Sequence, residues 1–128
     1  METGITGSQT ITVTESMTAE VMGSGMLPVY ATPSMIALME NTASNSVQDF
    51  LEKGQGTVGI RMDVKHVSAT PVGMKVTCKT KLTEVDRRRL VFEVQAFDEA
   101  GLIGEGIHER FIIDNEKFLS KAESKKER

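Results

Sequence analysis

The chain has 128 residues, the length of one domain with a sizeable core. Its 39% hydrophobic and 26% charged residues are ordinary for a globular protein, and a net charge of −3 gives no reason to expect nucleic acid as a partner. The single cysteine, Cys78, excludes an intrachain disulfide and fits a reducing compartment. No apolar run approaches the roughly 20 residues that cross a bilayer, and no signal-peptide pattern opens the chain. We therefore expect a cytoplasmic protein with no membrane partner.

The first part of the chain predicts one strand and a loop. Residues 1–8 are polar and glycine-rich, which is typical of a flexible end. Alternating polar and β-branched residues from Gln9 to Thr14 predict a strand, and Met17 to Met22 either extends it or pairs nearby. Residues 23–28 hold two glycines and a proline, and loops of that kind often cover a pocket.

One long helix is predicted from about Pro33 to Lys53. Thr32 is a good N-cap, Pro33 suits the first helical position, and Gly54 supplies a C-terminal stop. Apolar residues recur along it at helical spacing: Met35, Ile36, Met39, Ala43, Val47, Phe50 and Leu51. This apolar face requires a sheet to pack on.

The rest of the chain predicts antiparallel sheet. The expected strands are Thr57 to Val67, Met74 to Leu82, Leu90 to Phe97 and Leu102 to Ile113. In the first strand, one face is expected to carry Val58, Ile60, Met62, Val64 and His66, and the other Gly59, Arg61, Asp63 and Lys65. Asp114 is expected to cap a short terminal helix, and 121–128 to be a solvated, disordered charge run.

This order of elements predicts an α+β fold in which one antiparallel sheet wraps a single helix. We expect one domain over residues 1–128, with about 1–8 and 121–128 flexible. The open sheet edges of such a plan are commonly closed by a second copy of the chain.

Three polar residues stand in otherwise apolar surroundings: Thr32, Glu40 and His66. A hydroxyl, a carboxylate and an imidazole are the groups of an acyl-transfer or hydrolytic site. Each also has an ordinary structural explanation: Thr32 as a helix cap, Glu40 on the wet side of the helix, and His66 as a satisfied core residue. Glu40 is a plausible partner for His66, and we rank His108, on the last strand, below His66 because it fits a surface position.

Other site classes find little support. Two histidines 42 positions apart and one cysteine on another strand do not match a zinc spacing, so no metal is expected. The glycines at 54, 56 and 59 do not form a phosphate loop, and dinucleotide and nucleophile-elbow motifs are missing. Residues Arg87 to Arg89 fit a solvated hairpin tip, or contact with the phosphates of a nucleotide-bearing substrate.

Several segments together resemble the hotdog-fold thioesterases, in particular the fluoroacetyl-CoA thioesterase family. They are Ala31-Thr32-Pro33, Glu40, Gly54-Gln55-Gly56-Thr57-Val58-Gly59, the run from His66 to Gly73, and the run from Gly104 to Arg110. The likeness spans roughly Val29 to Phe118. It implies a hotdog fold, a homodimer with active sites near the protomer interface, and cleavage of acyl-CoA thioesters without metal or redox cofactor, CoA being part of the substrate.

The resemblance also implies roles for individual residues. Thr32, Glu40 and His66 match the family's catalytic threonine, glutamate and histidine, while Gly59 and Arg110 match its substrate-contacting glycine and arginine. In the fluoroacetyl-specific member, aromatic residues before the helix gate the pocket. Here residues 26–30 contain one aromatic side chain, which favours a broader acyl-CoA preference.

The expected activity is hydrolysis of a small or medium acyl-CoA to free acid and CoA. Glu40 would either attack the thioester directly or activate water as a general base, and both options stay open at this point. A non-catalytic acyl-CoA-binding module is the alternative, and a hotdog hydratase or dehydratase is a third possibility.

Overall fold

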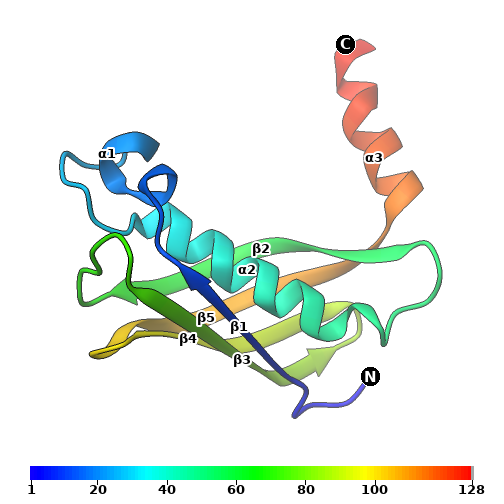
Figure 1. Ribbon diagram of the computed structural model, residues 1–128. Helices are drawn as coiled ribbons and strands as arrows, with labels where there is room; N and C mark the ends of the chain where they lie inside the picture. The colour runs from blue at the N-terminus through cyan, green and yellow to red at the C-terminus, as the bar shows by residue number, and fades with distance from the viewer. Residues whose placement is uncertain (128) are drawn as a thin grey trace.

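A single antiparallel sheet curves around one long helix, α2 (Thr32–Gln48), in the computed structural model, which describes residues 1–127 (Figure 1). The strands are β1 (Thr6–Thr12), β2 (Gln55–His66), β3 (Lys75–Asp86), β4 (Arg89–Asp98) and β5 (Gly101–Asp114). They lie in the order β1-β3-β4-β5-β2, with every neighbouring pair antiparallel. The predicted α+β architecture is confirmed, and β1 and β2 form the two edges of the sheet.

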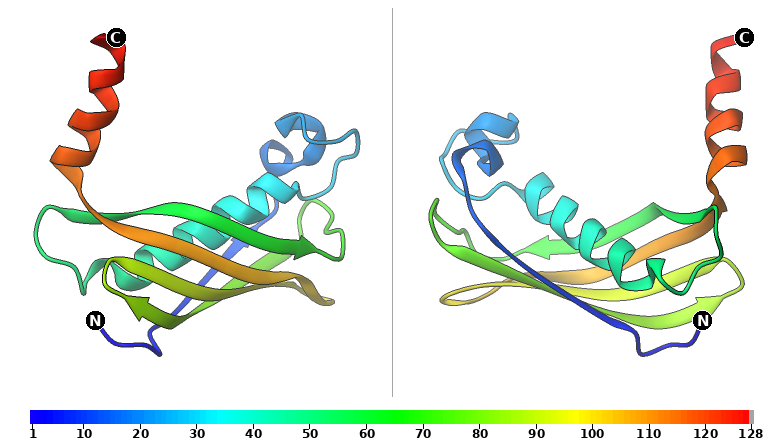
Figure 2. Two further views of the ribbon diagram at one scale, coloured as in Figure 1. Left: turned by 180° about the vertical axis from the view of Figure 1, so that it is seen from behind. Right: turned by 45° about the vertical axis from the view of Figure 1, so that its right-hand side comes forward.

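Helix α2 packs its apolar stripe against the concave face of the sheet (Figure 2). The buried residues of the helix are Met35, Leu38, Met39, Thr42, Ala43 and Val47. They meet the inward-facing residues of the strands, which include Val76, Cys78, Leu82, Leu90, Phe92, Val94, Ala96 and Ile103. This alternation of buried and exposed positions along β3 and β4 is what a half-buried antiparallel sheet requires.

The helix ends five residues before the predicted end at Lys53. Phe50, expected on the apolar stripe, has 59% of its surface exposed. The chain must turn after Val47 to reach the start of β2, and Gln55 fixes that turn: its Oε1 accepts from the backbone N–H of Glu52, and its carbonyl accepts from Gln48 Nε2. The loop therefore takes residues that helical periodicity alone assigned to α2.

A β-bulge interrupts the predicted alternation of β2. Gly59 pairs with Arg110 and Arg61 pairs with Glu109, so Ile60 is the extra residue. Ile60 has 53% of its surface exposed, and Gly59 faces α2 instead. The predicted faces of these two residues were therefore wrong, whereas Met62 and His66 after the bulge face the helix side as expected.

The two ends of the chain carry more regular structure than the sequence predicted. Strand β1 begins at Thr6, and the segment around Met17 to Met22 is helical, in η1 (Glu15–Met17) and α1 (Ala19–Met22). Asp114 caps α3 (Asn115–Glu123) by accepting a hydrogen bond from Lys117 N, as predicted.

After α3, the chain continues into η2 (Ser124–Glu127), where a disordered run was expected, and Arg128 lies outside the described residues. Helix α3 projects away from the sheet beyond β2 (Figures 1 and 2). Over the part of the chain that the structure describes, no helix is long and apolar enough to span a membrane.

Candidate active site

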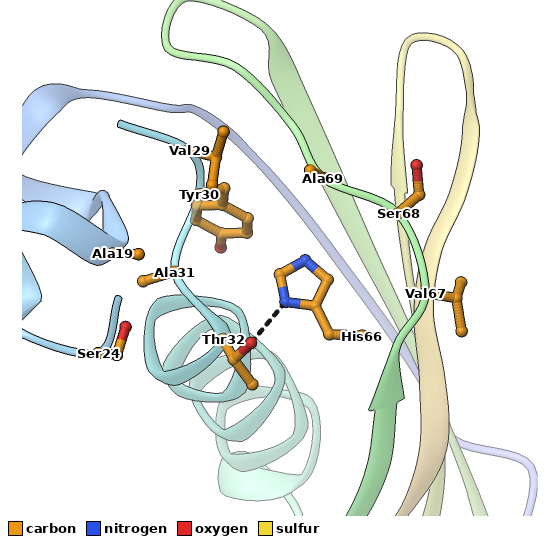
Figure 3. Close-up of a pocket in the computed structure, with 10 residues that line it drawn as sticks. All are labelled: Ala19, Ser24, Val29, Tyr30, Ala31, Thr32, His66, Val67, Ser68 and Ala69. Carbon is orange, nitrogen blue, oxygen red and sulfur yellow. Dashed lines mark hydrogen bonds between the residues drawn. The ribbon is translucent and has the colours of Figure 1, made fainter. Parts of the chain in front are cut away.

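Thr32 and His66 meet at the N-terminal end of α2. A hydrogen bond of 2.8 Å joins Thr32 Oγ1 to His66 Nδ1, between the first residue of the helix and the last residue of β2 (Figure 3). The N-cap position belongs to Ala31, not to Thr32 as predicted. The Thr32 hydroxyl is therefore not used for capping, and the ordinary explanation for this residue does not apply.

The second ring nitrogen of His66 is left without a bonding partner in the described residues. Nε2 is buried and has no hydrogen-bond partner among residues 1–127. Figure 3 shows this nitrogen directed away from Thr32, on the side of Ala69, with the Tyr30 ring packed edge-on at a centroid distance of 6.5 Å. Burial lowers the pKa of His66. A buried polar atom left without a partner is costly, and such atoms mark places where a ligand or water completes the bonding.

A pocket of about 320 Å³ opens beside this pair. It lies where the start of α2 meets the loop after β2 and the loop before α2, and its lining residues are Ala19, Ser24, Val29, Tyr30, Ala31, Thr32, His66, Val67, Ser68 and Ala69 (Figure 3). The free backbone N–H groups of a helix N-terminus and the positive end of its dipole gather at this point. An oxygen that gains negative charge is stabilised by such donors.

Glu40 lies at a different place on the same helix. It is eight residues beyond Thr32, about 12 Å along the axis, and its side chain is 43% exposed. Its partner is Arg110 Nη1, at 3.3 Å from Oε2, and not His66. Within one protomer, the structure joins Thr32 to His66 and Glu40 to Arg110, so the predicted direct pairing of Glu40 with His66 is absent from the described residues.

Arg110 is buried beside the Glu40 carboxylate and is held there by other partners. Its side chain is only 8% exposed, although a charged group is rarely buried without partners. Thr57 supplies two of these partners: Oγ1 accepts from Arg110 Nε at 2.8 Å, and the carbonyl accepts from Nη2 at 2.9 Å. The guanidinium is thereby oriented with Nη1 toward Glu40.

Gly59 leaves room for the carboxylate of Glu40. A Cβ at this position would collide with Glu40 Oε2 and would also press on His108 Cε1 and Arg110 Nη1, at 3.3 and 3.4 Å. The bulge at Ile60 turns Gly59 toward the helix, and the missing side chain leaves room for the carboxylate to lie against the strand. In this protomer Gly59 and Arg110 surround Glu40, and their predicted contact with substrate stays a prediction.

His108 is a buried member of this second cluster, whereas the sequence also allowed a surface position. It is 1% exposed and stacks on Phe92 at a centroid distance of 6.2 Å. The signal was present in β5, where His108 alternates with Gly104, Gly106 and Arg110 on the face toward α2. Within residues 1–127, no group of three or more His, Cys, Asp or Glu side chains is arranged to hold a metal ion.

Residues 13–116 match the family described as fluoroacetyl-CoA-specific thioesterase, FlK. A fluoroacetyl-CoA thioesterase from Streptantibioticus cattleyicolor is 41% identical over 97 residues, which are 76% of this chain and 70% of that protein. This chain belongs to the FlK family. The predicted recognition, a hotdog-fold thioesterase similar to fluoroacetyl-CoA thioesterases, is thus confirmed, and the chain is a thioester hydrolase of the acyl-CoA class.

Solved structures agree with the FlK assignment. The structure of FlK itself is similar with a TM-score of 0.93 and 34% identity, over 98% of this chain and 97% of that one. A thioesterase superfamily member from Thermus thermophilus gives 0.90 and 29%, over 98% and 93%. A hot-dog-like protein from Thermanaerovibrio acidaminovorans, at 0.89 and 21% over 98% and 93%, supports the hotdog fold alone. FlK variants have been crystallised with fluoroacetate and CoA and with acetyl-CoA.

Proposed function

We propose that this FlK-family enzyme hydrolyses short acyl-CoA thioesters with Thr32, His66 and Glu40 as its catalytic groups. The observation that carries the proposal is the Thr32–His66 pair at the N-terminus of α2, with His66 Nε2 buried and unpartnered beside a pocket. This is where a thioester carbonyl would find backbone donors for its oxygen and an imidazole for its leaving group.

The proposed reaction needs no group beyond the side chains and water. Glu40 removes a proton from water, and the water oxygen forms a bond to the thioester carbonyl carbon. The C–S bond then breaks and CoA leaves as the thiolate. His66 passes to the thiolate the proton that Glu40 took from water, which gives free acid and free CoA and returns Glu40 to its carboxylate form. Arg110 Nη1, at 3.3 Å from Glu40 Oε2, holds the carboxylate of Glu40 in place.

We also propose that the working enzyme is a homodimer joined along β2. This strand is an edge of the sheet, so its outer backbone groups are free to pair with a second copy. Symmetric antiparallel pairing about the middle of β2 places the half that carries Gly59 opposite the half that carries His66 in the other strand. Such a dimer brings Glu40 of the partner subunit toward Thr32 and His66, which one protomer keeps apart.

The pocket supports a preference for small acyl groups. Its volume of about 320 Å³ lies at the low end for ligand sites, so an acyl chain of a few carbons fits better than a long one. Among its lining residues, Tyr30 is the one phenylalanine, tyrosine or tryptophan. We propose a substrate range wider than fluoroacetyl-CoA, and a cytoplasmic enzyme, for which the free, buried thiol of Cys78 is suited.

Thiol release from a panel of acyl-CoAs tests the proposal. We expect wild-type enzyme to turn over short acyl-CoAs and Glu40→Gln to lose activity by a factor of about 10² or more, because the amide accepts no proton from water. Glu52→Gln is the matched control: Glu52 is exposed in the turn after α2, and turnover should be unchanged. Near-normal activity of Glu40→Gln would exclude Glu40 as the base, and binding without any release would indicate a binding module.

A further inference from the structure

Both ring nitrogens of His108 have a polar neighbour, whereas His66 has one at Nδ1 alone among the described residues. Its Nδ1 lies 2.8 Å from the carbonyl oxygen of Arg61, which only accepts hydrogen bonds, so Nδ1 carries the proton. Its Nε2 lies 3.2 Å from Arg110 Nη1, which only donates, so Nε2 is unprotonated. The two neighbours together require a neutral ring in the Nδ1–H form.

The same Arg110 nitrogen contacts both His108 and Glu40. Nη1 carries two hydrogens, and its acceptors are His108 Nε2 at 3.2 Å and Glu40 Oε2 at 3.3 Å. Thr57 fixes the other side of the guanidinium. The chain of contacts runs from the backbone of β2 through His108 and Arg110 to the carboxylate on α2, and none of it lies in the Thr32–His66 pocket.

We propose that His108 is a positioning residue for the thioesterase reaction: as a neutral Nδ1–H imidazole it aims Arg110 at Glu40 and so fixes the carboxylate over Gly59. This inference rests on the proposed catalytic role of Glu40. His108 itself touches neither the pocket nor the reacting atoms and acts through Arg110.

The surroundings of His108 explain why its ring suits this task. Phe92 on β4 stacks on one face, which fixes the ring plane, and burial disfavours the charged form. The charged groups that face it are Arg110 on its own strand and Glu40 on α2, while Glu109 lies on the opposite face of β5. Protonation of Nε2 would set an N–H against the guanidinium, and Arg110 would lose its acceptor there.

Two substitutions separate the two contacts of the ring. His108→Gln places an acceptor near the Nε2 position and keeps the contact with Arg110, whereas His108→Asn reaches only the Nδ1 position and keeps the contact with the Arg61 carbonyl. We expect His108→Asn to lower kcat about tenfold or more with KM nearly unchanged, because a misplaced carboxylate affects chemistry more than binding. We expect His108→Gln to restore most of kcat.

A double-mutant cycle with Glu40 tests whether His108 acts through the Glu40 carboxylate. In the Glu40→Gln background, adding His108→Asn should change the residual turnover less than twofold, because the carboxylate that His108 positions is already gone. A full additional loss would overturn the inference, and so would equal kcat values for His108→Asn and wild type. If Glu40→Gln itself keeps turnover, the proposed function fails; if it loses turnover while His108→Asn does not, only the positioning role fails.

The ring state can be read without activity. The protein contains two histidines, so a ¹⁵N spectrum shows two imidazoles, and His66→Gln assigns them. We expect His108 to show a protonated Nδ1 and an unprotonated Nε2 at pH 7.5. The opposite tautomer, or a cationic ring at pH 7, would overturn the inference even if the Asn variant does not fold.

Discussion

Both histidines are buried enough to stay uncharged at neutral pH. Burial lowers the pKa of His66 and of His108 from the ordinary value of 6.5. Below pH 6.5 the unfolded chain therefore binds protons on these rings before the folded protein does. The free energy of unfolding must fall as the pH drops through this window, by at most about 1.4 kcal/mol per pH unit for each histidine.

Urea unfolding at pH 7.5 and pH 5.5 checks this dependence. We expect wild type to have a lower free energy of unfolding at pH 5.5 than at pH 7.5. For His66→Gln and His108→Gln, we expect this difference in free energy to be smaller than for wild type. Glu109 does not interfere, because the Arg89 and Arg61 guanidinium groups lower its pKa below 4.5. An undiminished difference in both variants would mean that other groups cause the acid sensitivity.

At the level of single residues, the sequence revealed the groups more readily than their partners. The places of Thr32 at the start of the helix and of His66 at the end of a strand were predicted from the sequence, whereas the hydrogen bond between them was not. The ion pair of Glu40 and Arg110 was not predicted either, because it joins residues 70 positions apart and depends on how β5 pairs with β2. His108 looked like a surface residue because the outward or inward parity of β5 cannot be fixed without that register.

Among the elements, β2 carries the bulge that lies next to Glu40. Its bulge leaves Ile60 unpaired, so the register with β5 shifts by one residue between Gly59 and Arg61. Bulges also bend a strand and increase its twist, which suits a sheet that curves around α2. The bulge therefore decides which residue lies beneath Glu40.

A pair of deletions tests this role of the bulge. Deleting Ile60 leaves Gly59 next to Arg61, on the side of Glu40, and we expect the protein to fold and to keep much of its turnover. Deleting Gly59 moves Ile60 into the same place, where its side chain collides with the carboxylate, and we expect at least a tenfold lower kcat. Thiol release measures both, with circular dichroism to verify folding.

Equal activity of the two deletions would contradict this account of the bulge.

The sequence did not predict the bulge, because Val58, Ile60 and Met62 occur at every second position, as in a regular strand. The early end of α2 has a similar origin: Phe50 continues the helical pattern, but the turn held by Gln55 decides where the helix stops. Local patterns specify which elements form, and tertiary contacts specify where they end or kink.

For the whole molecule, the arrangement of polar groups favours a paired enzyme. One protomer keeps the Thr32–His66 pair and the Glu40–Arg110 pair at separate places along the α2–β2 contact. The sheet order leaves β2 at an edge beside these groups. The order of strands and helix was predictable because each element has a clear pattern and short connections, but the assembly is not readable from one chain.

Complementation tests the composite site. Glu40→Gln and His66→Gln chains, each inactive alone, are co-expressed with different tags and purified as mixed dimers. If each site takes Glu40 from one chain and His66 from the other, a mixed dimer has one intact site of two, and about half of wild-type turnover returns. No recovery would place all three groups of a site in one protomer, and light scattering verifies that the sample is a dimer.

The burial of Cys78 has a practical consequence. Its side chain is completely enclosed in the core, and burial raises the pKa of its thiol, so the reactive thiolate form is scarce and out of reach. A colorimetric sulfhydryl reagent therefore meets one source of signal while the protein is native, the CoA set free by the reaction. In denaturant and without substrate, the same reagent reacts with the Cys78 thiol of each unfolded chain, so the signal measures the amount of unfolded protein. Cys78 thus reports global unfolding but gives no signal while the native enzyme turns over substrate.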